Sequence, residues 1–426
     1  MNRLFALRDA RREAGRCLQC HDAPCVAACP AGIDVSAFIL GILTENIRGA
    51  AEVVKTANAL ANVCGAVCPE EIFCQSACTR AKQDSPVAIR ELHLFATREE
   101  REAGYSTPRP FGREGATVAV VGAGPAGLAC AMELAKHGHR VSVYDRSLPG
   151  GVPRSSIPPF RLRTEDLEGD LKFLGRFFTL GQLDVDIPAL KNLIETHDAV
   201  FLASGLGRDK PLGLPGAQLP GVMPVLPFLE RAKVPPVPGA PGSHVVIVGG
   251  GNVSLDAAAT AKRLGAAEVT LLYRRSEREM RVWQSELIEA REQGVLISTL
   301  TLPVGIIGRE RVEGVRCRRT RLIDQVDPDG RRRVAEVEGS EFTIAADAVI
   351  AAIGQTPSAG FLTMLDRTPG GHVRVDAEFR TSLPTVFAGG DLVGGEGTIV
   401  QSVAHGKAAA GAIHRQVTGA VREARP

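Results

Sequence analysis

A pattern of strand, glycine-rich turn and helix occurs twice in this chain of 426 residues, and it constrains the fold more than any other feature. The first copy, TVAVVGAGPAGLACAMELAKHGHRVSVYD, begins at Thr117, and the second, HVVIVGGGNVSLDAAATAKRLGAAEVTLLYRR, begins at His244. In both copies an apolar run of strand length precedes the glycines, and a periodic apolar pattern typical of a helix follows them. Each copy therefore predicts the β-α-β unit of a Rossmann-like domain.

The first turn carries the complete G-x-G-x-x-G pattern of a dinucleotide site. Glycine at these positions lets the backbone approach a pyrophosphate, whose charge then lies at the N-terminus of the following helix. The second strand ends at Asp145, the acidic position expected to bind a ribose hydroxyl. The sequence therefore predicts a dinucleotide site whose turn residues are Gly122, Gly124, Pro125, Ala126 and Gly127.

The second turn departs from this pattern, because Ser254 stands where the third glycine is expected. Its second strand leads into Arg274 and Arg275 instead of an acid, and arginines accommodate a 2′-phosphate that an acid would repel. We therefore expect NADP(H) here, with NAD(H) as the alternative if the two arginines only extend a solvated charged run. The turn residues expected to bind it are Gly249, Gly250, Gly251 and Asn252.

The order of these patterns predicts the domain organisation. Helical patterns occupy 36–48, 50–61 and 89–101, and the breakers TPRPFGREG and VPPVPGAPG mark two boundaries. We expect an α/β chain in which an N-terminal α-helical domain is followed by two nested Rossmann-like domains. The helical domain would span 1–111, and the first Rossmann-like domain, 112–238 and 346–426, would be interrupted by the second, 239–345.

A third glycine turn lies near the C-terminus. Gly389, Gly390 and Asp391 follow a predicted strand, and Thr398 precedes a predicted helix. This arrangement predicts that Gly390, Asp391 and Thr398 approach the first nucleotide. Two dinucleotide domains in one chain are typical of a flavin that stays bound, here FAD, and a nicotinamide that exchanges.

Eight of the ten cysteines lie between Cys17 and Cys78. Their spacings are C-x2-C-x4-C-x3-C-P and C-x3-C-P-x4-C-x3-C, and in a reducing compartment such a dense group predicts metal binding over disulfides. The spacing alone allows bacterial ferredoxin-like clusters or zinc. A flavin releases electrons singly to iron–sulfur clusters, whereas zinc has no redox role, so the nucleotide sites favour two [4Fe–4S] clusters.

Charge and hydropathy exclude other classes. Fifty Lys and Arg stand against forty-eight Asp and Glu, a balance that excludes a dedicated nucleic-acid binder. No run approaches the ~20 apolar residues of a membrane span, and the charged start excludes a secretory signal, so we expect a cytoplasmic protein. No serine–histidine–aspartate or paired-carboxylate signature is present, so we expect no catalytic acid or base. No C-x-x-C follows Cys20, which disfavours a disulfide mechanism.

Six segments together carry a resemblance to a known family: RCLQCHDAPCVAACPAGIDVSAFI, GAVCPEEIFCQSACTRA, GAGPAGLAC, GGGNVSLDAAATAKRLGA, VTLLYRRSEREM and FAGGDLVGGEGTIVQSVAHGKAA. They resemble the small subunit of glutamate synthase and the N-terminal half of dihydropyrimidine dehydrogenase, over nearly the whole chain. The resemblance implies an NAD(P)H-dependent oxidoreductase subunit that passes electrons through FAD and two [4Fe–4S] clusters to a partner redox enzyme.

The resemblance also implies ligand sets. One cluster would be held by Cys17, Cys20, Cys25 and Cys78. The other would be held by Cys29, Cys68 and Cys74, with a fourth ligand from the helix IRELHLFATREE. His93 lies at that position, and Glu91 and Cys64 are the alternatives.

The same resemblance places the flavin against Gly150, Gly151 and the segment IPPFRLR, which contains Arg161. It places the NADPH phosphate on Arg274 and Arg275. We expect a hetero-oligomer whose partner is of the dihydropyrimidine dehydrogenase type, the glutamate synthase type or another oxidoreductase. Three alternatives remain open: electron flow that reduces NAD(P)+, a stand-alone flavin reductase with structural zinc, and a non-enzymatic redox sensor.

Overall fold

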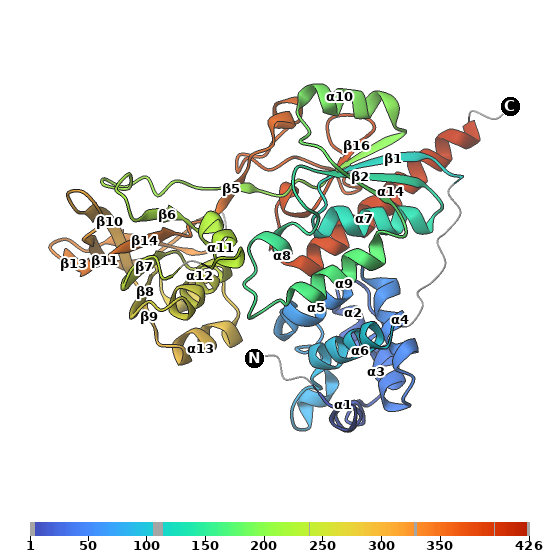
Figure 1. Cartoon of the computed structure of the whole chain (residues 1–426), viewed down its shortest axis with the longest axis horizontal. Coiled ribbons are helices and arrows are strands. Elements are labelled where there is room, and N and C mark those ends of the chain that lie inside the picture. The colour runs from blue at the N-terminus through green and yellow to red at the C-terminus, as the bar shows by residue number, and fades with distance from the viewer. Residues whose placement is uncertain (1–4, 105–113, 238, 328–329, 396, 424–426) are drawn as a thin grey trace. The chain divides into compact units, whose positions relative to one another are not determined.

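A computed structural model describes residues 5–104, 114–237, 239–327, 330–395 and 397–423, and side chains as far as residue 419. The chain divides into two compact units (Figure 1). The first comprises residues 1–154, 159–207 and 357–426, and the second comprises 155–158 and 208–356. The α/β class expected from the sequence, with an N-terminal helical region, is confirmed.

The N-terminal region of the first unit is helical (Figure 1). The helix expected over 36–48 is divided in two, because Glu45 adopts a left-handed φ of 62° and the Asn46 side chain accepts the N–H of Gly49 to begin a new helix. The elements are α1 (Leu7–Ala14), α2 (Pro24–Ala27), α3 (Val35–Leu43), α4 (Ile47–Ala57), α5 (Ala61–Val67), η1 (Glu70–Ile72), η2 (Thr79–Lys82) and α6 (Ile89–Ala103).

The first unit also contains a parallel sheet in the order β16-β4-β1-β2-β3. Its strands are β1 (Thr117–Val121), β2 (Arg140–Asp145), β3 (Thr179–Gln182), β4 (Ala199–Leu202) and β16 (Val386–Ala388). Helices α7 (Pro125–Lys136) and α14 (Ile399–Glu423) pack against each other, and α10 (Ile187–Thr196) and η4 (Gly360–Met364) share a core with the sheet. The shorter elements are α8 (Val152–Ser155), α9 (Thr164–Leu174) and η5 (Gly390–Val393).

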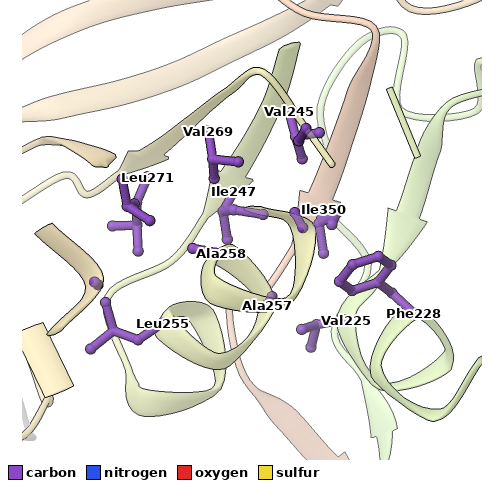
Figure 2. Packing of buried hydrophobic residues seen from close by; sticks show 14 of the residues in the cluster. Val225, Phe228, Val245, Ile247, Leu255, Ala257, Ala258, Val269, Leu271 and Ile350 are labelled. Atoms are coloured by element: carbon purple, nitrogen blue, oxygen red, sulfur yellow. The ribbon is translucent and has the colours of Figure 1, made fainter. Parts of the chain in front are cut away.

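The second unit contains its own parallel sheet, in the order β6-β14-β7-β8-β9. Its core packs Ile247 of β7 and Ile350 of β14 against Leu255 of α12 and Phe228 of α11 (Figure 2). The elements are β6 (Val222–Pro224), α11 (Val225–Lys233), β7 (His244–Val248), α12 (Asn252–Arg263), β8 (Glu268–Leu272), η3 (Glu277–Glu279), α13 (Gln284–Glu292), β9 (Val295–Ser298) and β14 (Ala348–Ala351).

An antiparallel sheet completes the second unit, in the order β10-β11-β12 with β13 also paired to β11. Its strands are β10 (Thr301–Ile307), β11 (Gly314–Val326), β12 (Arg332–Glu336) and β13 (Phe342–Ala345). A separate two-stranded sheet joins β5 (Gly207–Asp209) to β15 (Gln355–Pro357).

The sheet pairing differs from the expected boundaries at 238/239 and 345/346. Strand β14 pairs with β7, and β6 pairs with β14, so both strands belong to the second unit and not to the first Rossmann-like domain. The reason is that ADAVIAAIG is apolar throughout, and such a strand fits the centre of either parallel sheet. The expected boundary at 111/112 lies outside the described residues.

Candidate nucleotide and cluster sites

The first glycine turn packs as tightly as its sequence pattern predicts. A Cβ at Gly127 would lie 1.9 Å from the carbonyl oxygen of Gly122, so α7 can approach β1 this closely only with glycine. Gly124 is the N-cap residue of α7 and Pro125 begins the helix, where its missing N–H removes no hydrogen bond. The first turn of α7 therefore begins directly at the glycine loop, where its free N–H groups form an anion site.

Other expected residues of the first site converge on this turn. Gly150 donates its N–H to the carbonyl of Ala123 at 2.9 Å, and Gly151, with φ of +58°, lies so close that its Cβ would be 2.8 Å from the Cα of Gly124. From the C-terminal turn, a Cβ at Gly390 would lie 2.8 Å from the Cβ of Ala126. Three segments far apart in sequence thus meet at the N-terminus of α7.

The polar residues expected at the first site already have protein partners. The Asp145 carboxylate accepts N–H groups from Ala123 at 2.7 Å and Ser147 at 2.8 Å, which leaves lone pairs for further donors. Burial raises the pKa of Asp391. Thr398 accepts the N–H of Gln401 at 3.2 Å and so caps α14.

Arg161 lies half-buried in the loop that precedes α9.

The second glycine turn is built differently. A Cβ at Gly249 would lie 2.3 Å from the Ala352 carbonyl oxygen, and a Cβ at Gly250 would lie 2.3 Å from the ring of Tyr273. Ser254, at the third glycine position, is fully buried and its hydroxyl donates to the Gly251 carbonyl at 2.5 Å.

Asn252, expected among the turn residues, is the first residue of α12. Its side-chain oxygen accepts the N–H of Trp283 at 3.0 Å, so this side chain joins two segments of the second unit.

The two arginines after β8 have different surroundings. Arg274 is exposed. Arg275 is only 2% exposed, forms an ion pair with Asp327 and donates to the carbonyl of Arg332 at 2.7 Å. Arg275 thus joins the end of β8 to the β11–β12 hairpin, and of the two arginines only Arg274 is exposed.

The structure brings the first expected cluster ligands together. Burial raises the pKa of Cys25 to about 11, and the neighbouring Cys17 and Cys78 raise it further. Burial likewise raises the pKa of Cys17, with contributions from Cys78 and Cys20. Cys17 is thus an electrostatic neighbour of Cys20, Cys25 and Cys78. Because a raised pKa keeps a thiol neutral, a bound metal would be what stabilises the thiolate form here.

The second group is equally crowded. Burial raises the pKa of Cys74 to about 12, followed by the effect of Cys29. Burial also raises the pKa of Cys68 well above its usual value, followed by the effects of Cys64, Cys74 and Cys29. Cys64 is itself buried, and burial raises its pKa to about 12. Among the residues that the structure describes, no group of three or more His, Cys, Asp or Glu side chains is arranged to hold a single metal ion.

His93 has an open hydrogen-bonding position. Its side chain is 6% exposed, and its Nε2 has no hydrogen-bond partner among the described residues. Burial lowers its pKa to about 4, which keeps the imidazole neutral as a metal ligand requires. The alternative Glu91 pairs with Arg90 at 3.1 Å.

With this geometry established, comparison with known proteins is informative. Residues 116–410, more than half of the chain, match the family described as pyridine nucleotide-disulphide oxidoreductase. The chain belongs to this family. Residues 1–105 of this family member match a second family, dihydropyrimidine dehydrogenase domain II with a 4Fe-4S cluster. The protein is thus an NAD(P)H-dependent flavoprotein oxidoreductase with an iron–sulfur domain.

Curated relatives of this oxidoreductase match over almost the whole chain. The NAD-dependent dihydropyrimidine dehydrogenase subunit PreT of Escherichia coli K12 is 35% identical, over 96% of this chain and 95% of that protein. The NADPH glutamate synthase small chain of Halomonas elongata is 36% identical, over 94% of this chain and 89% of that protein. The resemblance inferred from the sequence is confirmed.

Solved structures of oxidoreductases share the fold. Mycobacterium tuberculosis FprA in complex with NADPH is 19% identical with a TM-score of 0.61, covering 73% of this chain and 86% of that one. The thioredoxin reductase of T. acidophilum is 20% identical with a TM-score of 0.53, covering 70% of this chain and 97% of that one. In the region that matches the oxidoreductase family, this chain has only Cys130 and Cys317, both buried, so it has no adjacent cysteine pair there for disulfide chemistry. None of the described helices is long and apolar enough to cross a membrane.

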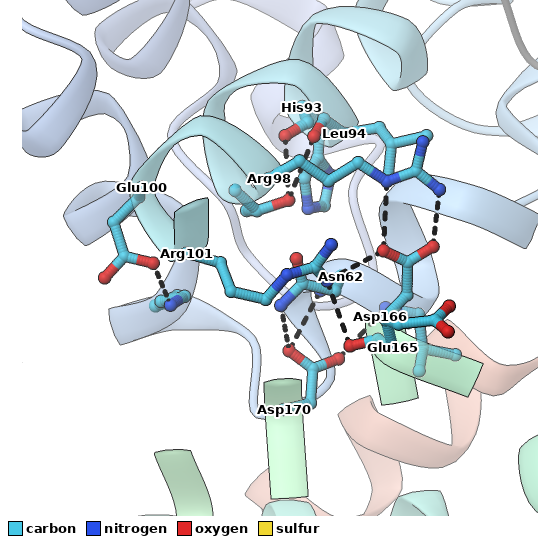
Figure 3. A network of polar contacts seen from close by, with 12 residues as sticks. Asn62, His93, Leu94, Arg98, Glu100, Arg101, Glu165, Asp166 and Asp170 are labelled. Atoms are coloured by element: carbon cyan, nitrogen blue, oxygen red, sulfur yellow. Dashed lines mark hydrogen bonds and ion pairs between the residues drawn. The ribbon is translucent and has the colours of Figure 1, made fainter. Parts of the chain in front are cut away.

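Two buried acids that attach α9 to the cysteine-containing helical region were not predicted from the sequence. Asp166 and Asp170 of α9 are buried and bind α6 and α5 (Figure 3). A signal was present, because two acids four residues apart lie on the helix face that also carries Leu167, Leu171 and Leu174. Carboxylates on an apolar helix face are expected to have buried partners.

Proposed function

We propose that this chain is the electron-input subunit of a larger redox enzyme. It takes electron pairs from NADPH and delivers single electrons to a partner subunit through FAD and two [4Fe–4S] clusters. The observation that carries this proposal is the set of eight free cysteines in a helical region that matches a 4Fe-4S domain family and belongs to the same compact unit as the complete glycine turn.

When bound, FAD accepts a hydride from the nicotinamide, and the clusters carry electrons one at a time. The chain's own residues fit FAD, since the Gly122, Gly124 and Gly127 turn presents the N–H groups of α7 to a pyrophosphate. Gly151 and Gly390 leave the approach clear, because any Cβ there would strike the turn or α7. Asp145, Asp391, Thr398 and Arg161 would complete the contacts.

In the second unit, the Gly249, Gly250 and Gly251 turn and the N-terminus of α12 would hold the NADP(H) pyrophosphate. Arg274 would bind the 2′-phosphate, since its guanidinium is exposed at the end of β8. Arg275 would support the site indirectly by fixing the adjacent hairpin. Asn252 would do the same through Trp283.

In the helical region, Cys17, Cys20, Cys25 and Cys78 would hold one cluster. Cys29, Cys68 and Cys74 would hold the other, with His93 as fourth ligand in preference to Glu91 and Cys64. The buried Nε2 without a partner supports His93, because an imidazole can replace a thiolate on a cluster iron.

Metal and sulfide analysis of the anaerobically purified chain tests this proposal. Two clusters predict about eight iron and eight sulfide per chain, and NADPH should bleach the visible absorption. Two zinc ions without sulfide would instead indicate a stand-alone flavin reductase, and an unbleached spectrum would indicate a sensor.

A cysteine variant tests the order of the carriers. Cys20→Ser should leave NADPH-to-dye turnover intact while abolishing delivery to the partner, and Cys317→Ser, a buried cysteine of the second unit, is the matched control. Loss of the dye reaction in a folded, FAD-loaded Cys20→Ser protein would contradict the proposed order.

The partner is proposed from the relatives, whose names describe subunits of dihydropyrimidine dehydrogenase and glutamate synthase. Copurification from the native source identifies it. If the partner supplies electrons instead of accepting them, electrons would flow in the opposite direction and the chain would reduce NADP+.

A further inference from the structure

Helix α9 of the first unit carries two carboxylates that are almost inaccessible to solvent. Asp166 is 0% and Asp170 is 1% exposed. Both side chains point toward residues of the helical region, Asp166 toward Arg98 and Asp170 toward Asn62 (Figure 3). Buried carboxylates are retained only when donors surround them, so their partners identify what α9 holds.

Asp170 holds the beginning of α5. Its carboxylate accepts the backbone N–H groups of Asn62 and Val63, both at 3.0 Å, and the side-chain amide of Asn62 at 2.7 Å. The first N–H groups of a helix have no partner within the helix, and a negative charge there also interacts favourably with the helix dipole. Asp170 thus fixes the helix that contains Cys64 and ends directly before Cys68.

Asp166 holds the middle of α6. It accepts from Nε of Arg98 at 2.9 Å and from Nη1 of Arg101 at 2.9 Å, and Arg98 is itself only 6% exposed. These arginines lie five and eight residues after His93 on the same helix. Helix α6, which carries His93, and helix α5, which ends directly before Cys68, are therefore both attached to α9 of the same unit.

Two lysines make further contacts with the helical region, mainly at the end of α4. Lys407 of α14 donates to the carbonyls of Ala31 at 2.6 Å and Ala57 at 2.7 Å, and Lys136 of α7 donates to the carbonyl of Thr56 at 2.5 Å. Thr56 and Ala57 end α4, where free carbonyls favour positive charge. Acids thus meet a helix N-terminus and lysines meet a helix C-terminus, which defines one relative orientation of the two regions.

We propose that Asp166 and Asp170 are positioning residues for the transfer between the flavin and the second cluster. They hold α5, which ends directly before Cys68, and α6, which carries His93, at a fixed distance from the glycine turn of α7. This inference rests on the proposed function. Because the rate of electron transfer falls steeply with the distance between carriers, loosening this contact slows the transfer without removing either carrier.

The test compares Asp170→Ala with wild type and with Glu168→Gln. Glu168 lies on the exposed face of the same helix and pairs with Arg154, so its variant removes a charge from α9 without touching α5. Each FAD-loaded protein is mixed anaerobically with NADPH, and cluster bleaching and dye turnover are followed. Hydrogen exchange at the Asn62 and Val63 amides is measured in parallel.

We expect Asp170→Ala to keep dye turnover within about twofold of wild type while cluster bleaching slows at least about tenfold. Exchange at the two amides should accelerate at least about tenfold, because they lose their acceptor. Glu168→Gln should match wild type in dye turnover, in the rate of cluster bleaching and in amide exchange. Bleaching at the wild-type rate in Asp170→Ala, despite faster exchange, would overturn the proposal.

Lys407→Met provides a second variant if Asp170→Ala does not fold. It loosens the contact of α14 with the end of α4 and should also slow cluster bleaching. Bleaching at the wild-type rate together with accelerated amide exchange in α4 would again overturn the inference. Different results would contradict the proposed function and the positioning role of Asp170. Wild-type protein without iron and sulfide contradicts the proposed function, and in that case unchanged amide exchange in Asp170→Ala separately contradicts the attachment of α5 by α9.

Discussion

The two Rossmann units begin with the same strand, turn and helix, yet they surround that turn differently. In the first unit, Gly127 packs against Gly122, and the segments of Gly151 and Gly390 also reach the turn. In the second unit, a buried Ser254 replaces the third glycine, and the exposed Arg274 follows β8. A turn enclosed by several segments suits a nucleotide that stays bound, whereas a turn with an exposed cation suits one that exchanges.

The units also differ in their connections to other structure. The nucleotide domain of the first unit is joined to the cysteine region through the buried acids of α9. The second unit uses its buried ion pair, Arg275 with Asp327, to attach its own hairpin. The same kind of interaction thus joins α9 to α5 and α6 in one unit and stabilises a local hairpin in the other, so a charged residue's role follows from what it touches.

The largest effect is expected for Asp166→Ala, which leaves the buried Arg98 without its carboxylate. We expect a loss of about 3–5 kcal/mol in the free energy of unfolding of the first unit at pH 7, measured by denaturant titration. Burial acts to raise the pKa of Asp166, but hydrogen bonds from Arg98 and Arg101 hold it below 3.8.

This lowered pKa gives the prediction a pH dependence. The stabilisation by ionised Asp166 is present above pH 3.8 and is lost as the pH falls through the lower pKa of the folded state. The difference between wild type and Asp166→Ala should therefore narrow below pH 3.8. A constant difference across this range would show that ionisation of Asp166 does not contribute.

The two glycine turns are distinguished by paired substitutions at the third position. Gly127→Ala should cost about 1–3 kcal/mol and release FAD, because the new methyl group would strike a backbone carbonyl. Ser254→Ala removes one hydrogen bond and should cost about 1 kcal/mol with NADPH binding preserved. Flavin absorbance after gel filtration measures how much FAD Gly127→Ala retains. Titration with NADPH measures the coenzyme affinity of Ser254→Ala. If Gly127→Ala kept its FAD as well as Ser254→Ala keeps NADPH binding, the two turns would not differ in their need for glycine.

The role of Arg274 is tested by coenzyme preference. Arg274→Ala should weaken NADPH binding by about 1.5–3 kcal/mol through loss of a charge-assisted hydrogen bond, with little change for NADH. Dissociation constants from fluorescence titration provide the comparison. An equal loss for both coenzymes would mean that Arg274 does not bind the 2′-phosphate.

For coenzyme binding, the smallest effect among the arginine variants is expected for Arg275→Leu. Asp327 also pairs with Arg333 and is partly exposed, so it keeps other partners when Arg275 is removed. We expect a cost of about 1–2 kcal/mol in the stability of the second unit, with the ratio of NADPH to NADH affinity unchanged. A selective loss of NADPH would restore Arg275 to the phosphate site.

The sequence was sufficient wherever the signal was local. The two strand–turn–helix units and the helix of His93 each lie within a short segment, and the structure forms them as predicted. The pairing of strands that lie far apart in the sequence could not be predicted in this way. The apolar strand β14 carries no mark of which parallel sheet it joins, and the structure pairs it with β7.

By itself, the sequence determined the backbone conformations that its glycines permit, the chemistry that its cysteines offer and the family to which the chain belongs. Only the tertiary structure decided that Arg275 is buried against Asp327 while Arg274 faces solvent, and that Asp166 and Asp170 hold α6 and α5. The physical reason is that a side chain's charge is written in the sequence, whereas its partner and its exposure depend on segments that meet only after folding.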